Sequence, residues 1–179
     1  MAATVNIKEY NGSDTASPLD TTAGITTSHY GYSSDSSADT ANIAAATTHP
    51  IPPGNNSYEK WQTLNITGGT YSTIDTIRIY RSSTRSPSLP ANTSHKVNAD
   101  VSPLTNDTAY DTATTAASVE ADQDMPDSDP AAASITGSFS NDATGESTFF
   151  VHQVQTTASP ETVDGYPTAQ LTYVWKEVA

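Results

Sequence analysis

The 179-residue sequence contains no cysteine, which excludes disulfides, thiol catalysis and Cys-ligated metal sites. Basic residues are also scarce: 7 Lys and Arg stand against 20 Asp and Glu, giving a formal net charge of −13. Because binding to nucleic-acid phosphates requires clustered cations, we expect no nucleic-acid partner. No apolar run approaches the roughly 20 residues that span a bilayer, and the N-terminal stretch lacks the pattern of a signal peptide. We therefore expect no membrane partner.

Large apolar side chains are also scarce. Only 26 of the 179 residues are Leu, Ile, Val or Phe, which is about 15% and below the rough 20% line under which chains tend to be disordered. These residues gather in a few windows, which favours a small core with much irregular covering. We predict a single domain over 1–179, with long loops or arms over the Ser/Thr/Asp/Ala-rich tracts 12–56 and 103–134. Polar tracts of this length are expected to gain their order from neighbouring subunits.

The densest strand-forming segment is SYEKWQTLNITGGTYSTIDTIRIYRSS, residues 57–83. It predicts two strands joined as a hairpin by a Gly68-Gly69 turn, since glycine readily adopts the positive φ angles of a tight reversal. Side chains alternate along a strand, so Leu64 and Ile66 should share one face and Trp61 should lie on the other. Ile74 is out of step with the following isoleucines, which predicts either a later strand start or a bulge.

Further segments alternate with a period of two residues. Strands are expected over 3–10, 95–101, 147–155 and 169–178, with weaker indications over 108–119 and 131–140. The strand over 169–178 should pair inside a sheet, because a free terminus frays. One helical turn at 41–46 is the only helical indication, and 120–130 is expected to be an acidic loop. Six to eight strands without a convincing helix predict an all-β fold, an antiparallel β-sandwich or jelly-roll-like domain with long irregular loops and arms.

No catalytic motif is present. The histidines are His29, His49, His95 and His152, and none shows the spacing of a zinc site. We expect each to be exposed or satisfied within the core. There is no GxSxG nucleophile elbow, and no spacing of carboxylates indicates a glycosidase pair. We therefore predict that the chain is not an enzyme, has no catalytic residues and needs no cofactor.

A weak metal candidate is the acidic run EADQDMPDSDP. Its aspartates resemble a calcium loop only loosely, because an EF-hand that began at Asp122 would need Gly at its sixth position and Glu at its twelfth. Those positions hold Asp127 and Ala133. A solvated acidic loop is the simpler interpretation, and incidental cation binding is the alternative. The candidate ligands are Asp122, Asp124, Asp127 and Asp129.

Two tryptophans and nine tyrosines offer a possible sugar-stacking platform. Packing of Trp61, Trp175 and the tyrosines in the core and at its edges is the simpler interpretation. The Asp-rich, Lys-poor composition, with much Thr and Ala, also resembles that of haloarchaeal proteins. High salt would screen the self-repulsion of such a charge. A surface-type composition without an export signal favours a virion protein, made in the host cytoplasm and released by lysis.

A resemblance to a family rests on NNSYEKWQTLNITGG, YSTIDTIRIYRS and the ending LTYVWKEVA. With the N-terminal TVNIKEYNG, these segments resemble small β-sandwich structural proteins of tailed viruses of bacteria and archaea; the acidic composition indicates a haloarchaeal one. The resemblance covers about a third of the chain and carries no catalytic residues. It implies a virion structural protein that decorates or projects from the capsid and stabilises it through homo-oligomeric contacts. Its partners would be itself, the major capsid protein or other virion proteins; the alternative is a tail-associated receptor- or carbohydrate-binding module.

Overall fold

The computed structural model describes residues 2–10, 19–20, 51–57, 59–82, 92–101, 123–129, 139–140, 143–157 and 170–179. Within these ranges every regular element is a strand. The strands are β1 (Thr4–Tyr10), β2 (Leu19–Asp20), β3 (Lys60–Gly68), β4 (Thr73–Ser82), β5 (Thr93–Val101), β6 (Gln123–Asp124), β7 (Phe139–Ser140), β8 (Gly145–Glu146), β9 (Phe149–Thr156) and β10 (Gln170–Val178). The all-β prediction is therefore confirmed.

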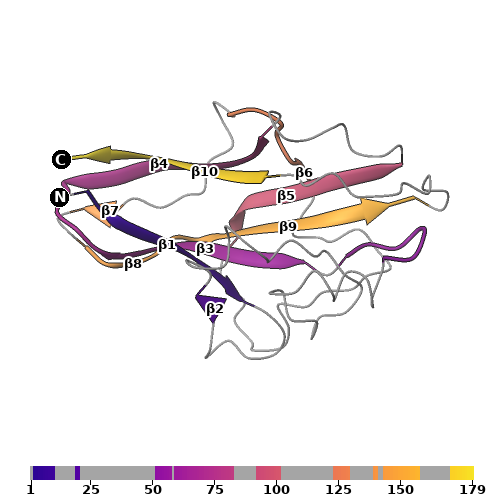
Figure 1. The fold of residues 1–179 in the computed structure, drawn as a ribbon, viewed down its shortest axis with the longest axis horizontal. Coiled ribbons are helices and arrows are strands. Elements are labelled where there is room, and N and C mark those ends of the chain that lie inside the picture. The colour runs from indigo at the N-terminus through magenta and orange to yellow at the C-terminus, as the bar shows by residue number, and fades with distance from the viewer. Residues whose placement is uncertain are drawn as a thin grey trace.

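The strands form two antiparallel sheets, which lie one above the other in Figure 1. The large sheet has the order β2-β1-β3-β9-β5-β6, and β8 pairs with β3 beside this path. The small sheet has the order β10-β4-β7. The start of β1 and the end of β10 meet at one end of the molecule, where the Ala3 amide donates to Glu177 Oε1 at 3.0 Å.

The expected strands over 3–10, 95–101, 147–155 and 169–178 match β1, β5, β9 and β10, and the two strands expected within 57–83 match β3 and β4. Alternating apolar side chains form these strands because one face of each packs on the core. The expected helical turn and the strand over 108–119 lie outside the described residues. The predicted tracts 12–56 and 103–134 are described only in part, and each contains a two-residue strand, β2 and β6.

The predicted hairpin between β3 and β4 is wrong. The two strands belong to different sheets, and the segment after Gly68 carries the chain from one layer to the other. Gly69 has φ +119°, and a Cβ placed there would lie 2.5 Å from the Ala3 Cα atom. A glycine is needed at 69 for both its backbone angle and this close approach of β1. The Gly-Gly signal was correct for a reversal but did not reveal which strands pair.

A bulge in β4 explains the misplaced isoleucine of the sequence pattern. Opposite β10, Val174 pairs with Arg78 but Lys176 pairs with Asp75, so β4 has one extra residue here. Thr76 has φ +55°, which is an unusual angle for a β-branched residue. The bulge resets the alternation, so that Ile74, Ile77 and Ile79 are all fully buried.

The position of β10 also differs from the prediction. It pairs with β4 along almost its whole length, and among the described residues no strand pairs with its other edge. β10 is also stabilised by packing, because Leu171, Tyr173 and Trp175 lie against the core. A terminal strand can thus stay in place with one paired edge.

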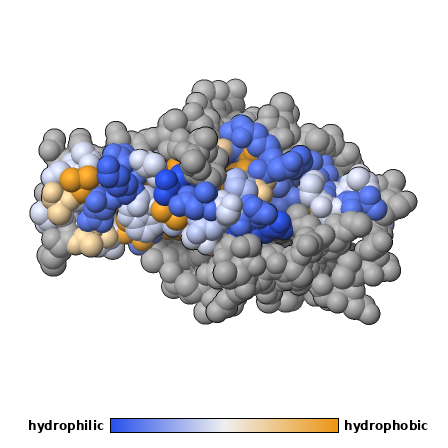
Figure 2. All heavy atoms as spheres, turned by 90° about the horizontal axis from the view of Figure 1, so that it is seen from above, coloured by the Kyte–Doolittle hydropathy of each residue, from blue (hydrophilic) through white to orange (hydrophobic). Residues whose placement is uncertain are grey.

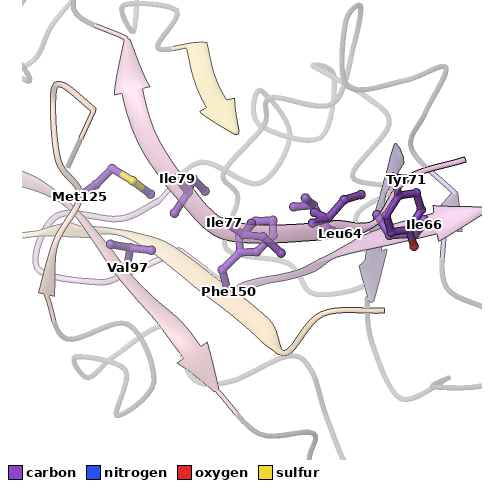
Figure 3. Packing of buried hydrophobic residues seen from close by; sticks show 9 residues of the cluster. Leu64, Ile66, Tyr71, Ile77, Ile79, Val97, Met125 and Phe150 are labelled. Atoms are coloured by element: carbon purple, nitrogen blue, oxygen red, sulfur yellow. The ribbon is translucent and has the colours of Figure 1, made fainter. Parts of the chain in front are cut away.

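The core fills the space between the sheets. Figure 3 shows it as an elongated row, with Met125, Ile79 and Val97 at one end and Ile66 and Tyr71 at the other. Its buried members come from both layers: Leu64, Ile66, Tyr71, Ile74, Ile77, Ile79, Val97, Met125 and Phe150. Full burial of one such aliphatic or aromatic side chain contributes about 1.5–3 kcal/mol. This row is what holds the small sheet on the large one.

The other face of the large sheet is buried as well at its centre. Trp61 lies there, opposite Val151 in the register and in edge-to-face contact with Phe149 at 5.6 Å between ring centroids. Its exposed fraction is 0%. The prediction that Trp61 and Leu64 occupy opposite faces is confirmed, since Leu64 belongs to the core row and Trp61 does not.

Candidate functional site: a buried histidine pair

Among the described residues, the cluster richest in reactive side chains lies between the two sheets. His95 of β5 and His152 of β9 point into the space between the sheets, together with Gln62 of β3. The register places them there: His152 lies opposite Val97 of β5 and Lys60 of β3, and residues opposite each other share a face. Alternation therefore orients both imidazoles inward along with the apolar residues of the same strands.

The side chains form one continuous polar chain that crosses from the large sheet to the small one. Tyr173 of β10 donates its hydroxyl proton to Gln62 Oε1 at 2.7 Å. His152 Nε2 lies 3.0 Å from the same oxygen, and His152 Nδ1 lies 3.4 Å from His95 Nε2. Because Gln62 Oε1 accepts, His152 carries its proton on Nε2, and its Nδ1 accepts from His95 Nε2–H. Both histidines fit this chain as neutral rings.

Burial keeps both rings neutral. The exposed fractions of His95 and His152 are 5% and 2%. Desolvation, followed by the nearby Arg81 guanidinium, lowers the pKa of His95 to about 3. Desolvation, then His95 and Lys60, lowers the pKa of His152 well below its usual value. Removing a charged imidazolium from water is costly, and the neighbouring cations add to that cost.

Aromatic rings surround the pair. Phe150 stacks on His152 with 6.4 Å between centroids and lies 5.1 Å from the ring of Tyr173. The Phe150 ring is fully buried. The polar chain therefore runs beside the apolar row of the core, where each hydrogen bond is stronger and each lost partner costs more than in water.

Two imidazole nitrogens 3.4 Å apart could in principle share a metal ion. Zinc in proteins takes three or four such ligands, however, and prefers a site without adjacent cations. Lys60 and Arg81 are near enough to lower the two pKa values, so they oppose a bound cation. No group of three or more His, Asp or Glu side chains with metal-site geometry occurs in the described parts of the chain. The arrangement is better suited to joining the sheets than to holding a metal.

Two buried serines have main-chain roles. The Val154 amide donates to Ser57 Oγ at 3.0 Å, and the Leu64 amide donates to Ser147 Oγ at 3.0 Å. Ser147 in turn donates to the Thr148 carbonyl at 2.8 Å. These hydroxyls satisfy backbone groups of β9 and β3, so their observed bonds are those of structural residues.

The acidic candidates for a metal site are separated by their partners. Asp124 contacts Lys96 Nζ at 2.7 Å, and Asp129 contacts Arg78 Nε at 2.9 Å. Asp127 is exposed. Asp122 lies outside the described residues, so its part of the metal prediction stays a prediction. The other three aspartates are not brought to a common centre.

Three of the aromatic residues proposed for a sugar platform, Trp61, Trp175 and Tyr173, are wholly or partly buried. Trp61 is fully buried and donates its indole Nε1–H to Glu59 Oε2 at 3.0 Å. Trp175 and Tyr173 are half-buried against the core. A stacking platform requires an exposed ring face, which excludes Trp61 from that role.

Sequence reasoning missed the histidine pair because 57 residues separate its members. The usable signal was weak: each histidine stands at an inward position of an alternating strand, two residues from Val97 or Phe150. That pattern indicates burial, which is what we expected of a satisfied core histidine. It does not indicate which strands lie side by side.

Comparisons with protein-family models, with curated proteins and with solved structures found no match to the chain. Among the described residues, no helix has the length and apolar character needed to cross a membrane.

Proposed function

We propose that this chain is a structural protein of a tailed virus, which decorates or projects from the capsid surface and stabilises it through contacts between copies. The observation that carries the proposal is the use of the buried reactive groups. His95, His152, Gln62 and Tyr173 bond to one another across the two sheets, and the first three are buried. Side chains arranged in this way stabilise a framework and have no access to a substrate.

The acidic charge supports the same proposal from another direction. A net charge of −13 on a body with a small core keeps copies apart at low salt and lets them approach when salt screens the charge. This behaviour suits a virion component in a salt-rich habitat. The resemblance of YSTIDTIRIYRS and LTYVWKEVA to tailed-virus structural proteins supplies the viral part of the proposal.

The alternative, a tail-associated module that binds a receptor or carbohydrate, has less support. It would use aromatic rings exposed on one face, and Trp61 is fully buried. We therefore place the capsid role first.

The test is mass spectrometry of purified particles of the virus that encodes the chain, with immunogold labelling of the same particles. The expected result is a fixed copy number relative to the major capsid protein and gold over the capsid. Gold confined to the tail tip would favour the receptor-binding alternative. Absence from washed particles, with the chain abundant in the infected-cell extract, would refute a virion role.

A further inference from the structure

Strand β10 has an edge with no strand partner in the described part of the structure. β10 spans Gln170–Val178 and pairs with β4 on one side only. On an edge strand, alternate residues direct their amide and carbonyl groups outward, which makes the edge a template for another extended segment. Proteins usually protect sheet edges by keeping edge strands short or by placing proline or clustered charges on them. By comparison, the nine-residue edge of β10 is long.

Apolar side chains beside this edge are only partly covered. Leu171, Tyr173 and Trp175 face the core but remain half-buried. The small sheet has three strands, one of them only two residues long, whereas the large sheet is much wider. Seen from above in Figure 2, apolar side chains reach the surface in several small patches, one of them at the end that carries the termini in Figure 1. One more strand beside β10 would widen the narrow layer.

The charge of β10 fits a second copy of the same strand. The chain as a whole has a net charge of −13, but β10 carries one lysine and one glutamate. Lys176 lies opposite Asp75 in the register, and Glu177 accepts a hydrogen bond from the Ala3 amide. Two copies can therefore approach along β10 without bringing clustered carboxylates together.

We propose that β10 pairs with β10 of a second copy, antiparallel and about a two-fold axis, so that the two small sheets become one continuous sheet. The inference rests on the proposed structural function and names the surface that joins copies. A two-fold contact is self-complementary, so one strand serves both partners. With the axis at Val174, Tyr173 lies opposite Trp175 of the other copy, and such aromatic cross-strand pairs are favourable.

The test is sedimentation equilibrium of the full chain and of two variants. Each is measured at about 0.2 M KCl, an ordinary ionic strength, and at about 2 M KCl, a high one. Val174→Glu places two glutamates face to face at the two-fold axis. Within one copy the new carboxylate lies opposite Arg78, so the fold should tolerate it. Thr144→Glu adds the same charge at an exposed site outside β10 and serves as the matched control.

The expected result is a wild-type dimer, an unchanged Thr144→Glu dimer, and a dissociation constant raised roughly tenfold or more by Val174→Glu at the lower salt. Hydrogen exchange of the wild-type β10 amides should also slow as concentration rises, a readout independent of any variant. Equal association of the two variants would overturn the β10 assignment but leave a structural role standing. A wild-type monomer at both salts, with unchanged β10 exchange, would overturn it too. Absence from virions would refute the structural role alone.

Discussion

Acidification should destabilise this protein through the buried histidine pair. His95 and His152 are neutral in the folded protein, and the pKa of His95 is lowered to about 3. In the unfolded chain both rings return to an ordinary pKa of about 6.5. The folded pKa values are depressed, so this contribution to stability is complete above pH 6.5. It is lost as the pH falls from 6.5 toward 3.

The magnitude follows from proton linkage. At pH 5 the unfolded chain binds a proton on the His95 imidazole and the folded chain binds none there, which costs about 2 kcal/mol. The pKa of His152 is lowered as well, so its protonation on unfolding adds a cost of the same sign. Since whole domains are stable by only about 5–15 kcal/mol, the loss is a large fraction of the total stability.

The assay is urea unfolding between pH 8 and 5, followed by the fluorescence of Trp61 and Trp175. His95→Asn should lower the pH slope, because one of the two buried imidazoles can then no longer take up a proton on unfolding. Val97→Ala is the matched control. Val97 lies opposite His152 but has no titratable group, so its truncation should lower stability equally at every pH. An identical slope in wild-type and His95→Asn protein would refute the reasoning, as would an imidazole NMR signal of His95 that titrates near pH 6.5.

Three further predictions concern single residues, each measured as the free energy of unfolding in urea. Gly69→Ala should lose about 2–4 kcal/mol through a strained φ and overlap with Ala3, whereas Gly68→Ala, where a Cβ meets nothing within 4 Å, should be neutral or gain up to about 1 kcal/mol. Equal losses would contradict the close approach of β1. Thr76→Asn should gain about 0.5–1 kcal/mol, because asparagine tolerates the observed φ of +55°. Its control, Thr73→Asn in the same strand, should lose a similar amount. A destabilised Thr76→Asn variant would argue against the bulge. Tyr173→Phe should lose about 1–1.5 kcal/mol with its hydrogen bond to Gln62, and an effect no larger than that of Tyr80→Phe on the outer face would mean that the bond contributes nothing.

Local patterns were sufficient to find the long strands β1, β3, β4, β5, β9 and β10, but not the two-residue strands β2, β6 and β8. The alternation of Val5 with Ile7, and of Phe150 with Val154, places these apolar side chains on one face of each strand, and that alternation is a local property of the sequence. The opposite orientation of Trp61 and Leu64 followed from the same rule. The bulge in β4 could also be anticipated, because Ile74 breaks the period before Ile77 restores it.

The pairing of strands could not be predicted in the same way. Gly68-Gly69 indicates a reversal, but a hairpin and a crossing between layers need the same backbone freedom, and only the approach of Ala3 selects the second. The position of β10 at an edge depends on what pairs with β4, which its own residues do not encode. The histidine pair depends in turn on β5 and β9 being neighbours. Long-range order of this kind arises from packing the whole core.

The most direct test of the account is a structure of the assembled protein at high salt, determined by electron microscopy of the oligomer or of the particle that contains it. We expect the small sheets of two copies to form one antiparallel sheet, in the order β7-β4-β10-β10-β4-β7, with the two Val174 side chains at the axis. An assembly in which both β10 edges face solvent, or a protein that stays monomeric at every salt concentration, would contradict it.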